Sequence, residues 1–405
     1  MSYKNFFNLR ENKNFLFNLL LCLALLQNFD FYTKNLIIII FLIIIFYNYK
    51  NISLKNKALL PLFFLITYLI FIYLFNSIDL LLFLLNIKFW FTFLFVILVY
   101  QLLNLNFTLN IFVFRFFLLL LILEFVIFNF FSNYSNIFIT QNSDALFFGF
   151  HRVIGFARNT SVSASTYVCL FVYFYQRKII KPLDWICLFL GLIVLFSSTS
   201  FLLITLFFFY FLLSKTNNKI KKIKKLIVLF FLILVMINMP IKQETGDYIL
   251  KKINYQKISK SYYVDNAFYK FNHLLCKVFE IQPIFNYKFS DNSLKTSYTC
   301  FIPVKINHIL GTSFTGNITR GGDFGWLDFY LNFGIVGLFV VLLSLRIYKI
   351  NNQLYLILLV ILSSFHYFTL ANIFTVIFFA MIFNEKKLKN NDDLVDISKS
   401  KHSKL

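Results

Sequence analysis

The chain has 405 residues, of which 59% are hydrophobic and only 14% are charged. A soluble domain has too little interior to hide so much apolar surface, so the composition indicates a membrane protein with many spans. The net charge of +22 raises a nucleic-acid-binding hypothesis. We reject it because the basic residues lie mainly in short connections between apolar stretches, where membrane insertion places them.

Twelve apolar stretches are predicted to cross the membrane, since about 20 apolar residues span the hydrocarbon core. The first follows Arg10 and Lys13 with no cleavage site after it, so it is predicted to be retained as a helix. The fold class is therefore an all-α polytopic membrane protein. The predicted spans are residues 14–31, 35–48, 58–76, 85–103, 111–131, 161–177, 183–198, 199–214, 225–240, 324–345, 353–369 and 370–384.

Lysine and arginine predict the orientation of these spans. With both termini inside, the inner connections carry 23 basic residues, whereas the short outer connections carry only Lys34, Arg152 and Arg158, with Lys88 at a span edge. The same layout places an 84-residue polar stretch outside. The predicted organisation is helices one to nine (1–239), a large external loop (240–323), helices ten to twelve (324–384) and a solvated cytoplasmic tail (385–405).

Two of the five cysteines fall in the polar stretch rather than in a span. Cys276 and Cys300 would meet an oxidising space on the outer side, where a disulfide between them is expected. The alternative is two free thiols that share a loop.

The first candidate site precedes the sixth predicted span. Arg152 and Arg158 lie six residues apart, next to His151, and a Ser/Thr-rich helix start follows. Arginine is a permanently charged planar fork suited to phosphate oxygens, and free N–H groups at a helix start favour anions. The alternative is that the two arginines anchor lipid headgroups. We favour an anion site because Gly155 and Asn159 indicate a shaped turn.

The second candidate site closes the polar stretch and opens the tenth span. Arg320, Gly322 and Asp323 precede Trp326 and Asp328. The glycine-rich backbone allows a tight bend or close approach to a ligand. Asp323 is suited either to capping a helix or to catalysis. Asp328 is expected to meet an arginine or lysine, because an unpaired carboxylate below the membrane surface is costly.

Two charged residues lie within the fifth predicted span. Glu124, midway along it, is interpreted either as a partner for Arg152, Arg158 or Arg320 or as a hydrogen-bonded structural carboxylate. Arg115, near its inner end, is predicted to extend its head group to the membrane surface.

These motifs and the layout resemble the O-antigen and capsule polysaccharide polymerases, within the wider O-antigen polymerase/ligase superfamily. Arg152-Val-Ile-Gly-Phe before a small-polar span resembles one family region. Asp323-Phe-Gly-Trp-Leu, followed by Gly334-Ile-Val-Gly337-Leu, resembles the segment after the family's loop. The similarity covers roughly residues 150–345 in motifs and the whole chain in layout. Gly334 and Gly337 are interpreted as helix-packing positions.

The resemblance implies a membrane glycosyltransferase with a GT-C-like architecture, located in a bacterial inner membrane. Its donor would be a glycan on undecaprenyl diphosphate, its acceptor a lipid-linked repeat unit, and a chain-length regulator a further partner. Arg152, Arg158 and Arg320 would stabilise the departing diphosphate without a metal or other cofactor, and Asp323 would accept the acceptor proton.

Two alternatives remain open at this stage. The ligase branch carries a His-Asn pair where this chain has Asp323-Phe324, which favours a polymerase. A flippase or other transporter of lipid-linked sugars would also have about twelve spans, but we find no repeated halves, and so large an external loop is unusual there.

Overall fold

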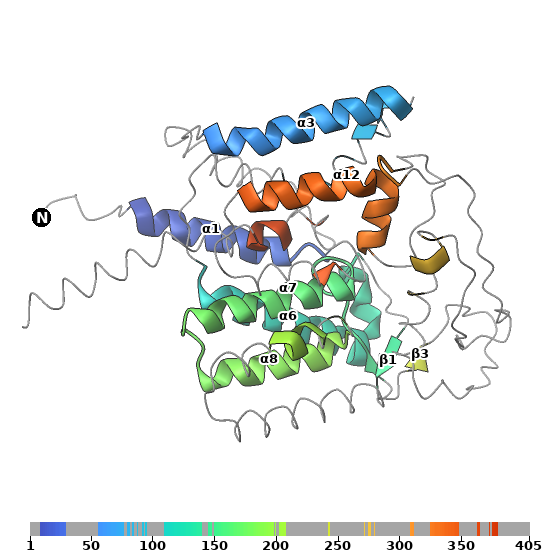
Figure 1. Ribbon diagram of the computed structural model, residues 1–405. Coiled ribbons are helices and arrows are strands. Elements are labelled where there is room, and N and C mark those ends of the chain that lie inside the picture. The colour runs from blue at the N-terminus through green and yellow to red at the C-terminus, as the bar shows by residue number, and fades with distance from the viewer. Residues whose placement is uncertain are drawn as a thin grey trace, which may run out of the picture.

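The computed structural model describes part of the chain, and this part is mostly helical (Figure 1). It covers residues 9–29, 56–76, 109–139, 145–147, 150–197, 199, 202–207, 242–243, 308–311 and 325–347, with shorter pieces within 79–94, 271–279 and 363–379. The named helices are α1 (Leu9–Leu25), α3 (Asn56–Asn76), α6 (Ile111–Phe130), α7 (Thr160–Gln176), α8 (Pro182–Leu195), α12 (Gly325–Ile347) and the short 3-10 helix η3 (Ser132–Ile137).

Helices α6, α7 and α8 lie side by side and form an aromatic core (Figure 1). Tyr167 of α7 is fully buried, stacks on Phe114 at 4.7 Å between ring centroids, and meets Phe117 edge-on at 5.3 Å. A Cβ on Gly191 would lie only 2.3 Å from the Tyr167 ring, so only glycine permits this approach of α7 to α8. The Tyr167 hydroxyl donates to the Cys187 carbonyl at 2.7 Å, which satisfies its one polar atom.

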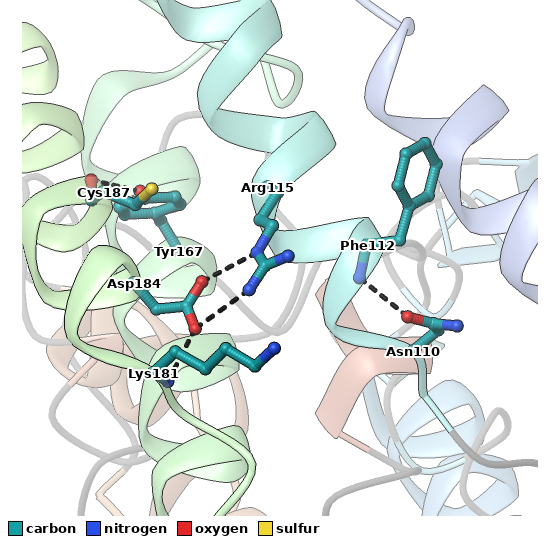
Figure 2. A network of polar contacts seen from close by, with 7 residues as sticks. All are labelled: Asn110, Phe112, Arg115, Tyr167, Lys181, Asp184 and Cys187. Carbon is teal, nitrogen blue, oxygen red and sulfur yellow. Dashed lines mark hydrogen bonds and ion pairs between the residues drawn. The ribbon is translucent and has the colours of Figure 1, made fainter.

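An ion pair fastens α6 to α8 at one end of this core (Figure 2). Arg115 donates from Nε and Nη2 to the two carboxylate oxygens of Asp184, at 2.8 and 3.2 Å. Asp184 also accepts the backbone N–H of Lys181 at 2.8 Å and so caps the start of α8. The sequence did not predict this ionic partner for Arg115, a fully buried carboxylate. The extension of its head group to the membrane surface stays a prediction.

The three helices alternate in direction. The ion pair brings together the first turns of α6 and α8, whereas the segment leading into α7 meets the last turn of α8 through the Val153 N–H and the Val194 carbonyl at 3.1 Å. Five helices lie within three residues of the ranges predicted from the sequence, namely α3, α6, α7, α8 and α12.

Apolar side chains cover the outer faces of several helices. Two helical stretches, Ile111–Phe130 and Gly325–Leu343, are long and apolar enough to cross a membrane by length and composition. Exposed apolar patches of this extent are rare on soluble monomers and are typical of surfaces that contact a membrane or another protein. The exposed apolar residues of α3 and α8 include Leu60, Phe63, Phe64, Ile66, Ile70, Phe71, Leu74, Leu183, Ile186, Phe189, Leu190 and Ile193.

A small sheet departs from the all-α prediction. Strand β1 (Ala145–Phe147) pairs antiparallel with β2 (Phe150–His151) on one side and with β3 (Lys242–Gln243) on the other. Strands of two or three residues are too short to show an alternation of polar and apolar side chains, so they could not be predicted from the sequence. The sheet joins the beginning of the polar stretch to the approach to the first candidate site.

Helix α12 is broken at Gly334, which has φ 64° and ψ −166° (Figure 1). The turn at residues 308–311 fills the break, because the carbonyls of His308 and Ile309 accept the N–H groups of Ile335 and Val336 at 3.0 and 3.1 Å. The predicted tenth span, residues 324–345, coincides with α12, but the break at Gly334 within it was not predicted. Gly334 serves this backbone contact rather than helix packing.

Gly337 does lie at a packing position, as predicted. A Cβ there would be 2.8 Å from the hydroxyl of Tyr68 on α3, and that hydroxyl donates to the carbonyl of Phe333. The break in α12 and its contact with α3 are therefore adjacent.

We predict that Gly334→Ala destabilises the protein by about 3 kcal/mol, since this backbone conformation is essentially restricted to glycine. The new Cβ would also lie 2.3 Å from the Ile309 carbonyl oxygen. Unfolding of the detergent-solubilised protein measures the change. Ile335→Ala is the matched control, because that side chain is 58% exposed; equal stability of the two variants would contradict the prediction.

Candidate functional site

Residues 150–159 form a fixed turn ahead of α7. Gly155 has φ 77°, and its carbonyl accepts the N–H of Arg158 at 3.1 Å. Arg158 itself has φ 53°, and Asn159 then caps α7 by accepting the Val162 N–H at 3.1 Å. A Cβ on Gly155 would lie 2.6 Å from Ser163, so this glycine is required both for its dihedral angle and for its space. The predicted shaped turn is present.

The buried carboxylate of Glu124 holds the turn from beneath. Its Oε1 accepts the Ile154 N–H at 2.9 Å, and both oxygens accept the Gly155 N–H at 3.1 and 3.2 Å. The Asn28 amide adds a longer contact at 3.4 Å. Only 4% of Glu124 is exposed. Among the described residues, Glu124 thus fits the interpretation as a hydrogen-bonded structural carboxylate, whereas Arg320 lies outside them.

Asn129, five residues further along α6, holds the start of the same segment. Its side chain accepts the His151 N–H at 2.6 Å and donates to the His151 carbonyl at 3.0 Å. These two hydrogen bonds take the place of those that a neighbouring strand would make at the free edge of β2. His151 is consequently positioned through its backbone.

Hydroxyl groups of α7 complete the support. Thr160 donates to the Val153 carbonyl and Ser163 accepts the Ala157 N–H, each at 3.3 Å. The backbone between His151 and Asn159 is therefore bound at both ends and in the middle. A site built on it keeps its geometry without a ligand.

The two arginines lie on this rigid segment. Arg152 is half-buried, whereas Arg158 is exposed and donates from Nη2 to the Gln27 carbonyl at 3.2 Å. Within the described part of the chain, this bond uses one of the five N–H donors of the Arg158 guanidinium. The charge and most of the N–H donors of this exposed side chain therefore face outward. The positive end of α7 begins one residue later and adds to the local potential.

One part of the predicted anion site needs correction. The start of α7 was expected to offer free N–H groups, but Asn159 occupies that of Val162. Thr160 and Ser161 are each only 7% exposed. Because the first turn of α7 is capped and covered, anion binding here depends on the guanidinium groups.

The second candidate group is described only in part. Trp326 and Asp328 are half-buried in α12 ahead of the break, and Trp326 packs edge-on against Phe329 at 6.0 Å. Arg320, Gly322 and Asp323 lie outside the described residues. Their approach to the first group stays a prediction, as does an ionic partner for Asp328.

The predicted disulfide is also described at one end only. Cys276 is fully buried and disulfide-bonded, whereas Cys300 lies outside the described residues, so the pairing itself remains a prediction. Cys22, Cys169 and Cys187 are free thiols.

Several residues that build the site were not identified from the sequence, namely Gln27, Asn28, Asn129 and Ser163. Each is a polar side chain at the end of an apolar stretch, which is a weak signal because most such residues face water or headgroups. Among the described residues, no three of His, Cys, Asp and Glu converge as a metal site would require.

We predict that Glu124→Leu releases the turn, because it leaves the N–H groups of Ile154 and Gly155 buried without an acceptor. The expected loss is about 2–6 kcal/mol of stability, from about 1–3 kcal/mol for each of the two unsatisfied groups. Trypsin should then cleave the native protein after Arg158 at least tenfold faster. Glu124→Gln, which keeps one acceptor oxygen, should lie between Glu124→Leu and wild type, and Leu123→Ala, at a 41% exposed neighbour, should match wild type. Unchanged cleavage in Glu124→Leu would contradict the role assigned to this carboxylate.

Comparisons with known proteins return no match to this chain, whether with protein-family models, curated proteins or solved structures.

Proposed function

We propose that this chain is a multi-span membrane glycosyltransferase that polymerises lipid-linked oligosaccharide repeat units at the outer face of a bacterial inner membrane, giving O-antigen or capsular polysaccharide. The observation that carries the proposal is the turn at residues 151–159. It carries Arg158, and Arg152 six residues before it, on a backbone fixed by Glu124 and Asn129. The motif resemblance gives the reaction class.

The chemistry requires an electrostatic site at the membrane surface. An acceptor hydroxyl attacks the anomeric carbon of the donor glycan, a new C–O bond forms, and the bond to the lipid diphosphate breaks with its electron pair. The hydroxyl proton passes to a base, for which Asp323 is the proposed residue. Negative charge grows on the diphosphate as it leaves, and pre-positioned guanidinium groups stabilise that charge without reorganisation.

The placement of the polar stretch supports the same proposal. At its start, Lys242 and Gln243 form β3, which pairs with β1. The other neighbour of β1 is β2, which contains His151. Its last described turn, residues 308–311, binds the break in α12 just beyond Asp328. A large external segment tied next to both candidate groups is suited to hold a glycan while its lipid remains in the membrane.

The orientation can be tested with single cysteines at the two ends of the helical core. Ser132→Cys at the start of η3 should react with a membrane-impermeant maleimide in intact spheroplasts. Lys181→Cys at the start of α8 should react only after the membrane is permeabilised. Both side chains are exposed, so the difference reports the side of the membrane. Labelling of Lys181→Cys alone in intact spheroplasts would reverse the proposed topology.

The activity can be tested in proteoliposomes supplied with a polyprenyl-diphosphate-linked repeat unit, with product length read on gels. Arg158→Asn should slow chain growth by roughly 100- to 1000-fold, the range for loss of one transition-state donor. Asparagine tolerates the left-handed backbone at this position. Arg158→Lys should recover part of the rate, since lysine keeps the charge but lacks the planar pair of donors that binds phosphate oxygens bidentately.

Lys178→Ala is the matched control, because Lys178 is an exposed cation with a similar φ of 56° that follows the opposite end of α7. It should polymerise like wild type. Wild-type length distributions in Arg158→Asn would remove the basis of the proposal. Transfer of preformed glycan to a lipid acceptor without any elongation would instead indicate a ligase.

A further inference from the structure

A polar side chain just after α1 lies beside the arginine turn without a partner of its own. Gln27 belongs to a tight turn in which its N–H bonds to the Ala24 carbonyl at 3.3 Å and the Phe29 N–H to the Leu26 carbonyl at 2.9 Å. The carbonyl oxygen of Gln27 accepts Nη2 of Arg158 at 3.2 Å. Its side-chain oxygen Oε1 is buried and has no hydrogen-bond partner in the described part of the chain.

The turn that carries Gln27 is firmly held. Asn28 donates to Glu124, and its carbonyl accepts the Ile139 N–H at 2.8 Å. Phe29 forms a β-bridge with Phe138, and their rings lie 4.8 Å apart. The position of Gln27 relative to the Arg158 turn is therefore fixed by contacts on both sides, and Glu124 is common to both.

An unsatisfied buried oxygen is costly and needs an explanation. Exchanging the oxygen and nitrogen of the carboxamide would leave a buried NH₂ group unsatisfied instead. The occupant cannot be a phosphate oxygen, because two acceptors repel each other. It must offer a hydrogen-bond donor, and it would bind the residue whose backbone carbonyl already accepts the Arg158 guanidinium.

We propose that Gln27 binds a hydroxyl or acetamido N–H of the saccharide unit attached directly to the lipid diphosphate. This inference rests on the proposed function and deepens it. Arg158 takes the phosphate, and Gln27, bonded to it through its own backbone, takes the first sugar. A neutral carboxamide suits this role because it exchanges hydrogen bonds with hydroxyl groups without attracting the diphosphate itself. Gln27 is thus a substrate-binding residue that distinguishes glycan-bearing from bare lipid.

The test measures binding of two probes to the full-length protein in detergent, namely polyprenyl diphosphate without sugar and the same lipid carrying one saccharide. Gln27→Met keeps the length of the side chain and removes its polar end. It should bind the bare lipid like wild type and the saccharide-bearing lipid about tenfold more weakly. Arg158→Asn should weaken binding of both probes. Asn133→Ala, at an exposed amide in η3, should change neither.

The outcomes separate the two proposals. Failure of the wild-type protein to bind either lipid overturns the proposed function and this inference with it. Wild-type binding of both probes by Gln27→Met overturns the inference alone and assigns Oε1 to a structural water. Equal weakening for both probes also overturns it, since Gln27 would then only support the turn.

Thermal unfolding without ligand gives a second readout. Gln27→Met should be at least as stable as wild type, because it removes an unsatisfied oxygen. A clear loss of stability would show that Oε1 has a structural partner and would overturn the assignment to the substrate.

Discussion

The arrangement of the candidate site depends on one buried carboxylate. Glu124 lies among apolar side chains on α6, where water is excluded and backbone N–H groups must find acceptors within the protein. It supplies an acceptor for two successive N–H groups of the turn and for an amide at the end of α1. Three segments distant in sequence therefore meet at one side chain. The backbone that carries the two arginines is placed by this contact.

The polar contacts of the helical core lie at its two ends. Arg115 and Asp184 pair at one end of α6, Glu124 and Asn129 bind backbone toward the other, and stacked aromatic rings fill the space between. Each charged group has a specific partner, which agrees with the high cost of unpaired charge away from water. The two ends are therefore chemically distinct: one is closed by an ion pair, and the other presents an exposed guanidinium.

Local features of the sequence predicted local features of the fold. Apolar runs predicted the positions of α3, α6, α7 and α8, and Gly155 with Asn159 predicted the turn and helix start. The long-range partners were not predictable. Glu124 binds backbone N–H groups about thirty residues away, and a backbone group leaves no mark in the sequence. Arg115 and Asp184, 69 residues apart, could be paired only once the direction and rotation of two helices were known.

The break in α12 explains how a long polar stretch coexists with a fixed site. One end of the stretch is paired at β1, and the other is bound by the N–H groups freed at Gly334. His308 adds a side-chain contact to the Tyr330 hydroxyl at 2.8 Å, ahead of the break. Because both attachments are made by backbone groups, substitutions between them leave the attachments intact, and the entropy of loop closure changes only slowly with length. The side chains between the two attachments can therefore vary while Trp326, Asp328 and the arginine turn keep their places.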